Sequence, residues 1–178
     1  MASIKTQLSA QRLLTDGTAV SLVVGSLIVG SLRYNAEMWL QDYPPDVRAR
    51  YGSMSDRARR QQRLFALPFF LSFFGGLLYS TLKLKAENGG ALSFRAAFVH
   101  VFLLYQFFVL FDTLVIDWFL IGWIQPEWVV LPGTEGMASY NDYYYTLEVT
   151  YLNPRPWLVA IVVSLIIASL ARLIKWER

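Results

Sequence analysis

Residues 96–125 form a long apolar run, and this run constrains the fold more than any other feature of the sequence. It reads AAFVHVFLLYQFFVLFDTLVIDWFLIGWIQ and contains no Lys or Arg. At about 1.5 Å per residue a helix of this length reaches about 45 Å, whereas the hydrocarbon layer of a bilayer is about 30 Å thick. The run therefore predicts a membrane-spanning helix that tilts or projects beyond the bilayer.

Three further apolar segments occupy residues 13–32, 64–82 and 157–173 of the 178-residue chain, which is 55% hydrophobic. Four spans leave no room for a separate soluble domain. We therefore predict an all-α membrane protein with a single integral membrane domain over residues 1–178, folded as a four-transmembrane-helix bundle. A basic start before an apolar run is also typical of a cleaved signal peptide, but we expect the first segment to be retained.

Two polar connections, residues 33–63 and 126–156, lie on the same face of such a bundle. The first carries seven basic and four acidic residues and the second one basic and four acidic, which gives net charges of +3 and −3. Because these charges are opposite, we expect the connections to fold over each other as a cap. Exposed ion pairs in it would each contribute little to stability.

The orientation of the bundle is not fixed by its basic residues. Eight of the 16 lie on the face of the connections and eight on the face of the termini, namely Lys5, Arg12, Lys83, Lys85, Arg95, Arg172, Lys175 and Arg178. The positive-inside rule therefore gives a tie. Net charge favours cytoplasmic termini, and we predict a multi-pass protein of a cell membrane in that orientation.

Four arginines, Arg57, Arg59, Arg60 and Arg63, precede the second apolar segment. A helix that starts at Ser53 or Ser55 would place them at the level of the lipid headgroups. Contact with anionic lipid is the favoured interpretation, and binding of a phosphate substrate is the alternative. The net charge of +3 is small and spread along the chain, so a nucleic-acid partner is not expected.

Small residues recur every four positions in two spans, as Gly17, Ser21 and Gly25 and as Ala160, Ser164 and Ala168. Small residues at this interval let a second helix approach closely. Their matching period indicates that the first and fourth helices pack together. The same faces also predict association with a membrane-protein partner or a second copy of the chain, beside contact with the lipid bilayer.

The long run carries three ionisable residues, His100, Asp112 and Asp117. On an ideal helix each residue turns about 100°, which separates Asp112 from Asp117 by about 140° and places His100 on a third side. One site made from all three on this helix is therefore not expected. Gln106 and Thr113 share a stripe with Asp117, so the candidate polar intramembrane site consists of Gln106, Asp112, Thr113 and Asp117.

Two interpretations of these aspartates remain open. Ionisable groups at this depth are costly and often functional, which favours a proton-accepting or cation-binding carboxylate. In the structural interpretation each aspartate is protonated or hydrogen-bonded to a donor on another helix, such as Thr81, Ser21 or Ser164.

Metal, thiol and nucleotide chemistry find no support in the sequence. It has no cysteine and one histidine, so thiol catalysis and thiolate-held metals are excluded and at most one imidazole ligand is present. We expect His100 to lie at the membrane interface. No Walker A loop, dinucleotide fingerprint, nucleophile elbow or paired-histidine zinc motif occurs, and no cofactor is indicated.

The second connection supplies a further candidate site, formed by Glu135, Tyr140 and Asp142. It is rich in tyrosine, at positions 140, 143, 144, 145 and 151. These side chains either form an interfacial belt, the favoured interpretation, or line a pocket. Residues 143–152 are aromatic and β-branched, which is compatible with an extended segment.

Several short motifs occur together: Asp42-Tyr43-Pro44, the pair Asp112 and Asp117, and the loop Pro132-Gly133-Thr134-Glu135-Gly136-Met137 followed by Tyr140 and Asp142. In this combination the chain resembles a group of small bacterial membrane proteins of uncharacterised function. The resemblance covers about residues 34–145, and the loop is its most specific part. It implies a four-helix protein of the bacterial inner membrane and carries no activity.

Two functional hypotheses follow. The first is a non-catalytic subunit or binding partner in a membrane complex, supported by the small-residue faces and the lack of catalytic motifs. The second is a membrane-embedded transporter or enzyme for a lipophilic substrate that uses the intramembrane aspartates. A cavity that reaches Asp117 from beneath the cap would favour the second, and tightly packed, hydrogen-bonded aspartates would favour the first.

Overall fold

The computed structural model describes residues 7–174, which are almost entirely helical and contain no strand. The long helices are α2 (Ala10–Asn35), α4 (Asp56–Glu87), α5 (Phe94–Phe111) and α7 (Pro154–Leu173). A π-helix, η2 (Asp112–Ile124), continues α5 without a break. Four helical segments are long and apolar enough to cross a membrane. The predicted all-α, four-helix membrane bundle is confirmed.

Polar caps explain why the helices extend beyond the apolar segments. The Ser55 hydroxyl accepts a hydrogen bond from the Ala58 N–H, and Ser93 accepts one from Ala96 in the same way. A side-chain acceptor at this position satisfies one of the free N–H groups of the first turn. Helix α4 therefore begins two turns before its apolar segment.

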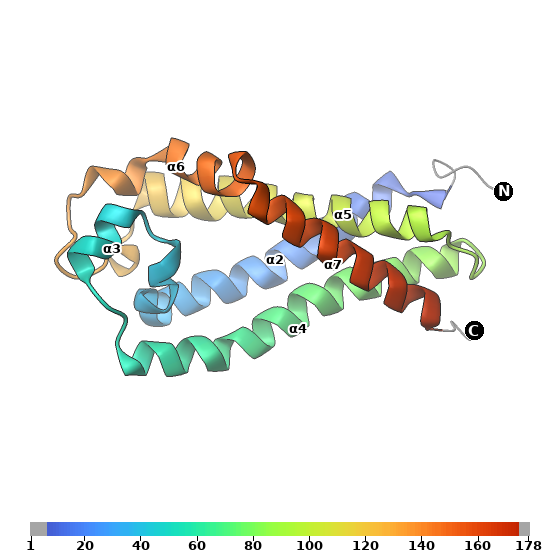
Figure 1. Ribbon diagram of the computed structural model, residues 1–178, viewed down its shortest axis with the longest axis horizontal. Coiled ribbons are helices and arrows are strands. Elements are labelled where there is room, and N and C mark those ends of the chain that lie inside the picture. Colours follow the sequence, from blue (N-terminus) through green and yellow to red (C-terminus); the bar gives the residue numbers. More distant parts are fainter. Residues whose placement is uncertain (1–6, 175–178) are drawn as a thin grey trace.

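The start of α2, the turn between α4 and α5, and the end of α7 lie at one end of the bundle (Figure 1). We call this the terminal end. The two polar connections lie at the opposite end, which we call the cap end. Lys5, Lys175 and Arg178, which entered the charge count, lie outside the described residues.

The first and fourth helices, α2 and α7, are not main packing partners, in contrast to the prediction from their small residues. Helix α2 packs on α4 and α5, whereas α7 crosses the bundle on α5 and α4 (Figure 1). A Cβ atom on Gly17 would lie 2.9 Å from the Phe107 ring, and one on Gly25 would lie 2.8 Å from the Phe111 ring. The small residues of α2 therefore make room for large rings, and the predicted contact between the first and fourth helices is wrong.

The small-residue faces are consequently interior. The side chains of Ser21, Ala160, Ser164 and Ala168 have no solvent exposure. Gly17 and Gly25 are buried as well. Neither face is available to a partner or a second copy in this arrangement, because the chain covers both faces itself.

The two connections are built from short helices. The first contains η1 (Ala36–Asp42) and α3 (Pro45–Tyr51). The second contains η3 (Glu127–Val129), η4 (Ala138–Asn141), α6 (Tyr143–Leu147) and a short π-helix, η5 (Glu148–Leu152).

The connections contact each other through hydrogen bonds. The Tyr43 hydroxyl donates to the Val129 carbonyl at 2.7 Å, and the Arg50 Nε donates to the Gly133 carbonyl at 3.1 Å. The Ser139 hydroxyl also donates to the Asp46 carboxylate. Within residues 7–174 no ion pair joins the two connections. The two connections are therefore joined by individual hydrogen bonds in which a charged group meets a neutral one or both groups are neutral, and not by pairing of their opposite charges.

The second half of connection 126–156 differs from the expected cap. Helices α6 and η5 run antiparallel beside η2, since Tyr143 packs against Gly122 while Tyr151 lies beside Thr113. The interpretation of residues 143–152 as extended is wrong. Asp142 accepts a hydrogen bond from the Tyr145 N–H and so starts a helix at the aromatic run.

Candidate functional site

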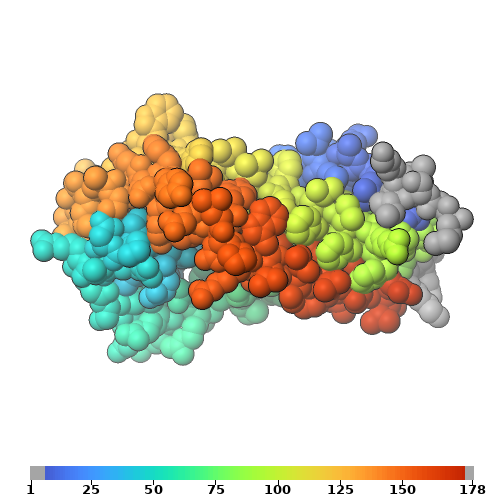
Figure 2. All heavy atoms as spheres, turned by 45° about the horizontal axis from the view of Figure 1, so that its top comes forward, coloured from blue at the N-terminus to red at the C-terminus, as the bar shows by residue number. Residues whose placement is uncertain are grey.

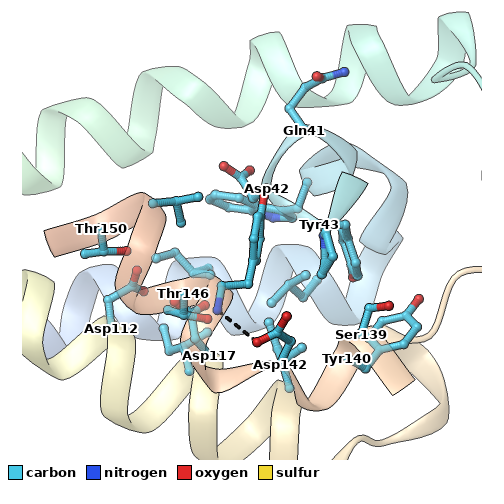
Figure 3. A pocket seen from close by; sticks show the side chains of 18 residues that line it. Gln41, Asp42, Tyr43, Asp112, Asp117, Ser139, Tyr140, Asp142, Thr146 and Thr150 are labelled. Atoms are coloured by element: carbon cyan, nitrogen blue, oxygen red, sulfur yellow. Dashed lines mark hydrogen bonds between the residues drawn. The ribbon is translucent and has the colours of Figure 1, made fainter. Parts of the chain in front are cut away.

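A pocket of about 380 Å³ lies at the cap end between η1, η2 and the segment α6–η5 (Figure 3). Its walls combine acidic, aromatic, hydroxyl and aliphatic side chains. The lining residues are Ile28, Leu32, Trp39, Gln41, Asp42, Tyr43, Pro44, Asp112, Ile116, Asp117, Ile121, Ser139, Tyr140, Asp142, Tyr145, Thr146, Val149 and Thr150.

Asp112 and Asp117 both open into this pocket, which corrects the angular separation expected from the sequence. That separation assumed an α-helix, but the chain becomes a π-helix at Asp112. A π-helix bonds residue i to i+5 and holds about one residue more per turn than an α-helix. Residues five apart therefore lie about one turn apart on the same side, and the two carboxylates belong to one site.

The pocket-facing residues of η2 follow the same period. They are Asp112, Ile116, Asp117 and Ile121, spaced by four, one and four. This is one face of a helix with between four and five residues per turn. The π-helix ends at Gln125, whose φ of 44° places a non-glycine residue in the left-handed region. Such a conformation is costly, and it turns the chain abruptly into Pro126.

Neither carboxylate is neutralised by a neighbour. Within residues 7–174, no side chain or backbone N–H donates a hydrogen bond to Asp112 or Asp117, and neither forms an ion pair. Among the described residues, no Lys or Arg lines the pocket. In Figure 3 both side chains point from η2 toward the space beside Thr146 and Thr150. Two unpaired carboxylates at this depth repel each other when ionised, so a proton or a cationic ligand would stabilise the site.

The donors expected for a structural role are engaged elsewhere. The Thr81 hydroxyl donates to the Leu77 carbonyl, and the Ser164 hydroxyl donates to the Ala160 carbonyl. The Ser21 hydroxyl has no hydrogen-bond partner among the described residues. None of these three groups reaches an aspartate.

Two members of the predicted intramembrane site lie outside the pocket. Thr113 is 2% exposed, and its hydroxyl approaches the Tyr151 hydroxyl at 3.5 Å. Gln106 belongs to α5 and does not line the pocket. The structure therefore brings together Asp112 and Asp117 and leaves Gln106 and Thr113 apart from them.

Two further aspartates, Asp42 and Asp142, line the pocket. Asp42 ends η1, and Asp142 precedes α6. Arg48 of α3 is close enough to act on Asp42, although it does not line the pocket. Within residues 7–174 no three acidic or histidine side chains converge on a point that could hold a metal ion. The carboxylates are instead distributed around the cavity.

Aromatic side chains form much of the remaining wall. The rings of Tyr43 and Tyr140 meet edge to face at 5.8 Å. Burial raises the pKa of the Tyr43 phenol well above its usual range, and nearby Tyr140 and Asp42 add to the effect. Burial also raises the pKa of Tyr145, which Arg48 opposes. Both phenols are therefore neutral near pH 7, and the tyrosines supply ring faces and hydroxyls rather than charge.

The predicted cap-loop site is divided. Tyr140 and Asp142 line the pocket, whereas Glu135 is exposed and lies outside it. The Glu135 carboxylate accepts a hydrogen bond from the Gly133 N–H at 3.0 Å. Backbone N–H groups of Glu135 and Gly133 lower the pKa of this carboxyl. Glu135 thus closes its own turn and does not face the cavity.

The loop of residues 132–137 supports the pocket through Tyr140. The Leu131 N–H donates to the Tyr140 hydroxyl at 3.0 Å, and the Thr134 hydroxyl donates to the Leu131 carbonyl at 2.7 Å. Since the only Thr134 hydroxyl proton is used, Tyr140 is the donor in its 2.7 Å contact with Thr134. Gly133 and Gly136 have φ values of 81° and 75°, which glycine adopts without strain.

The four arginines predicted to contact headgroups are all exposed at the start of α4. The Arg59 Nη2 donates to the Met54 carbonyl, and its Nε lies 3.7 Å from Asp56. Arg57, Arg60 and Arg63 remain open to the surface. Their contact with lipid headgroups stays a prediction.

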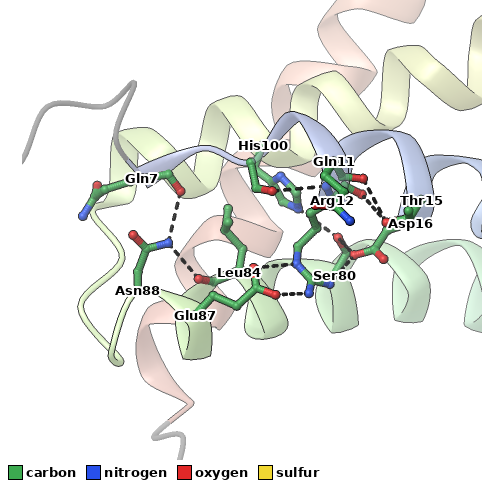
Figure 4. Close-up of polar contacts among 11 residues, drawn as sticks. Gln7, Gln11, Arg12, Thr15, Asp16, Ser80, Leu84, Glu87, Asn88 and His100 are labelled. Atoms are coloured by element: carbon green, nitrogen blue, oxygen red, sulfur yellow. Dashed lines mark hydrogen bonds and ion pairs between the residues drawn. The ribbon is translucent and has the colours of Figure 1, made fainter.

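A second polar cluster, at the terminal end, was not predicted from the sequence (Figure 4). Arg12 lies 2.8 Å from the Asp16 carboxylate and bonds Glu87 through its Nε at 2.9 Å. The Ser80 hydroxyl donates to Asp16 at 2.6 Å and lies 2.9 Å from the His100 Nε2. The available signal was Asp16, a charge early in an apolar segment.

His100 faces the interior of the bundle, and its position at the membrane interface stays a prediction. It is fully buried, because Ser80 of the neighbouring helix offers a polar partner inside the bundle. Since Ser80 donates its proton to Asp16, the His100 Nε2–H is the donor toward Ser80. The Nδ1 atom has no partner among the described residues.

Comparison of the chain with protein-family models, with curated proteins and with solved structures gave no match.

Proposed function

We propose that this integral membrane protein binds an organic cation in the cap-end pocket and acts as a carrier or binding component for it. The observation that carries the proposal is a cavity beneath the cap into which two unpartnered aspartates, Asp112 and Asp117, open. Such a cavity was the feature expected to favour the second functional hypothesis. A ligand of opposite charge would offset the cost of these carboxylates.

The arrangement of the carboxylates favours an organic cation over a metal ion. Asp42, Asp112, Asp117 and Asp142 are spread around a cavity of about 380 Å³ and do not converge. The faces of aromatic rings attract cations that lie over them. A tetraalkylammonium or similar ion would therefore meet negative charge and ring faces at the same time.

Catalysis is less well supported than binding. The pocket presents hydroxyl groups from Ser139, Thr146 and Thr150, but the one histidine of the chain lies in the terminal-end cluster. Among residues 7–174, no histidine or lysine is hydrogen-bonded to a hydroxyl of the pocket and placed to accept its proton. The chemistry of the lining is that of recognition.

A role as a non-catalytic subunit in a membrane complex is the second candidate. Its remaining support is the exposed apolar surface of the helices, because the small-residue faces are interior. A bacterial inner-membrane location, cytoplasmic termini and kinship with the small bacterial proteins also remain proposals. The resemblance in residues 34–145 and the net charge of the two faces support them.

Binding of radiolabelled tetraethylammonium to the protein in lipid nanodiscs tests the proposal. We expect saturable binding that Asp117→Asn and Asp112→Asn each weaken at least tenfold, because the neutral amides cannot offset the ligand charge. Asp56→Asn is the matched control, since Asp56 is exposed at the cap end and outside the pocket. Equal binding by wild type and Asp117→Asn would refute the proposal.

A further inference from the structure

A groove of about 310 Å³ adjoins the pocket on the side of α4. It lies between η1 and the first turns of α4. Its lining is mainly apolar and aromatic: Met38, Trp39, Asp42, Gln62, Arg63, Phe65, Ala66, Phe69 and Phe70. Figure 2 shows a hollow in the surface at the cap end where the first connection, α4 and the chain that leads into α7 come together.

The groove and the pocket share two wall residues, Trp39 and Asp42. The two cavities are therefore neighbours, and Trp39 and Asp42 belong to the walls of both. The Trp39 indole N–H donates to the Ser31 hydroxyl at 2.9 Å. Its ring packs against Phe65 and Phe69, with centroids 5.7 and 6.3 Å away.

The outer side of the groove faces the lipid of the bilayer. Phe70 of the groove is 50% exposed, and Leu67 and Leu71 beside it are each 65% exposed. Large apolar side chains this exposed on a membrane-spanning helix lie against lipid. The groove therefore runs from the lipid-facing surface of α4 to Asp42 at the edge of the pocket.

We infer that the ligand of the pocket is a cationic amphiphile that enters from the bilayer between η1 and α4, with its apolar chain in the groove. The inference rests on the proposed function, because the cationic head occupies the pocket with Asp112 and Asp117. The apolar chain lies along Phe65, Ala66 and Phe69. Trp39 and Asp42, which line both cavities, lie where the head joins the chain.

The charges of the two cavities support a cationic head in the pocket and an apolar chain in the groove. In the part of the chain that the structure describes, the wall of the deep pocket contains four aspartates and no lysine or arginine. The groove holds a single aspartate, at the junction, and Arg63 at its rim. A soluble cation needs only the pocket. An amphiphile uses both cavities, and the groove gives its chain an apolar surface continuous with the lipid.

The test compares two quaternary ammonium ions on the protein in lipid nanodiscs. Dodecyltriethylammonium competes with radiolabelled tetraethylammonium for the site, and the ratio of the two affinities is the readout. Burial of one methylene strengthens binding by about fourfold, so a few buried methylenes give a large advantage to the long chain. The ratio between variants corrects for partition of the long chain into lipid.

Ala66→Trp fills the groove, and Leu67→Trp places the same ring on the adjacent lipid-facing position as a control. We expect Ala66→Trp to reduce the advantage of the dodecyl chain at least tenfold, with the tetraethylammonium affinity changed less than twofold. Leu67→Trp keeps the wild-type ratio. The retained tetraethylammonium site also reports that the variant is folded, and Ala66→Phe serves as a milder second variant.

The other outcomes are distinct. If Ala66→Trp and Ala66→Phe keep the wild-type ratio while Asp117→Asn abolishes binding, the groove does not hold the chain. A bilayer lipid in the groove would give that result. The lateral route would then be wrong while the proposed function stands. If Asp117→Asn binds tetraethylammonium like the wild type, the proposed function itself fails.

Discussion

The bundle carries one half-buried acidic region at each end, and the two regions differ in whether the fold supplies partners for the carboxylates. At the terminal end Asp16 is paired with Arg12 and accepts a hydrogen bond from Ser80, with side-chain exposures of 18% for Arg12 and 20% for Asp16. At the cap end Asp112 and Asp117 line a cavity without a partner among the described residues.

The difference separates charge that stabilises the fold from charge that we propose is held for a ligand. When a carboxylate is paired with a cation and a hydroxyl donor, these partners offset the cost of its burial within the fold. When a carboxylate faces a cavity, that cost is offset only if a proton or a ligand binds. The same residue type therefore helps to tie three helices together at one end and lines the proposed binding site at the other.

The largest expected effect is that of removing the cation of the terminal-end cluster. Arg12→Met removes three charge-assisted hydrogen bonds, leaving Glu87 without a partner among the described residues and Asp16 with Ser80 alone. We expect it to lower the free energy of unfolding by about 3 kcal/mol, about 1 kcal/mol for each of these partly exposed bonds. Steric trapping or thermal unfolding in detergent measures the loss. Arg95→Met, an exposed arginine of α5 at the same end, is the control and should change stability little. A loss equal to that of the control would place the cluster outside the stabilising interactions.

The same substitution at both ends tests the comparison directly. Asp16→Asn weakens two charge-assisted hydrogen bonds, and we expect a loss of about 2 kcal/mol. Asp117→Asn removes an unpartnered buried charge, so stability should stay within about 0.5 kcal/mol or increase. Thermal unfolding of the two variants, measured at one pH in the same detergent, gives both values. If Asp117→Asn destabilises the protein as much as Asp16→Asn, Asp117 has a structural partner. The two ends would then not differ in how their carboxylates are compensated.

The sequence allowed the four spans to be predicted because long apolar runs have few alternative structures. The pairing of Asp112 with Asp117 could not be predicted, since it depends on the change from α- to π-helix at Asp112. That change alters the turn per residue, and no residue type encodes it. The spacing of Asp112, Ile116, Asp117 and Ile121 identifies the common face only once the period is known.

The terminal-end cluster was missed for a different reason. His100 and Ser80 lie on different helices, so their contact depends on the packing of α4 against α5. The angle of His100 on its own helix gave no information about this neighbour. Similarly, Gly17 and Gly25 signalled a close approach correctly, but the approaching atoms are rings of α5 and not another row of small residues.

A smaller effect is expected where the connections join beside the pocket. Tyr43→Phe removes the hydrogen bond to the Val129 carbonyl and leaves that buried acceptor unpaired. We expect a loss of about 1 kcal/mol. Amide hydrogen exchange should also become faster in residues 127–131 while α5 keeps its protection. Uniform loss of protection along the chain would contradict a local joint.

The smallest effect is a dependence of the cap on acid. The Ser139 hydroxyl lowers the pKa of the Asp46 carboxyl below its ordinary value. A group with a depressed folded pKa stabilises the fold above its unfolded pKa and loses that contribution as the pH falls through the folded pKa. We therefore expect hydrogen-exchange protection of residues 138–141, corrected for intrinsic rates, to decrease between about pH 5 and about pH 3.

In Ser139→Ala the protection should be lower at neutral pH and fall less on acidification. The fall that remains is assigned to Glu135, whose pKa is lowered by backbone N–H groups and is untouched by the substitution. An acid response that is as large in Ser139→Ala as in the wild type would remove Asp46 from the joint between the connections.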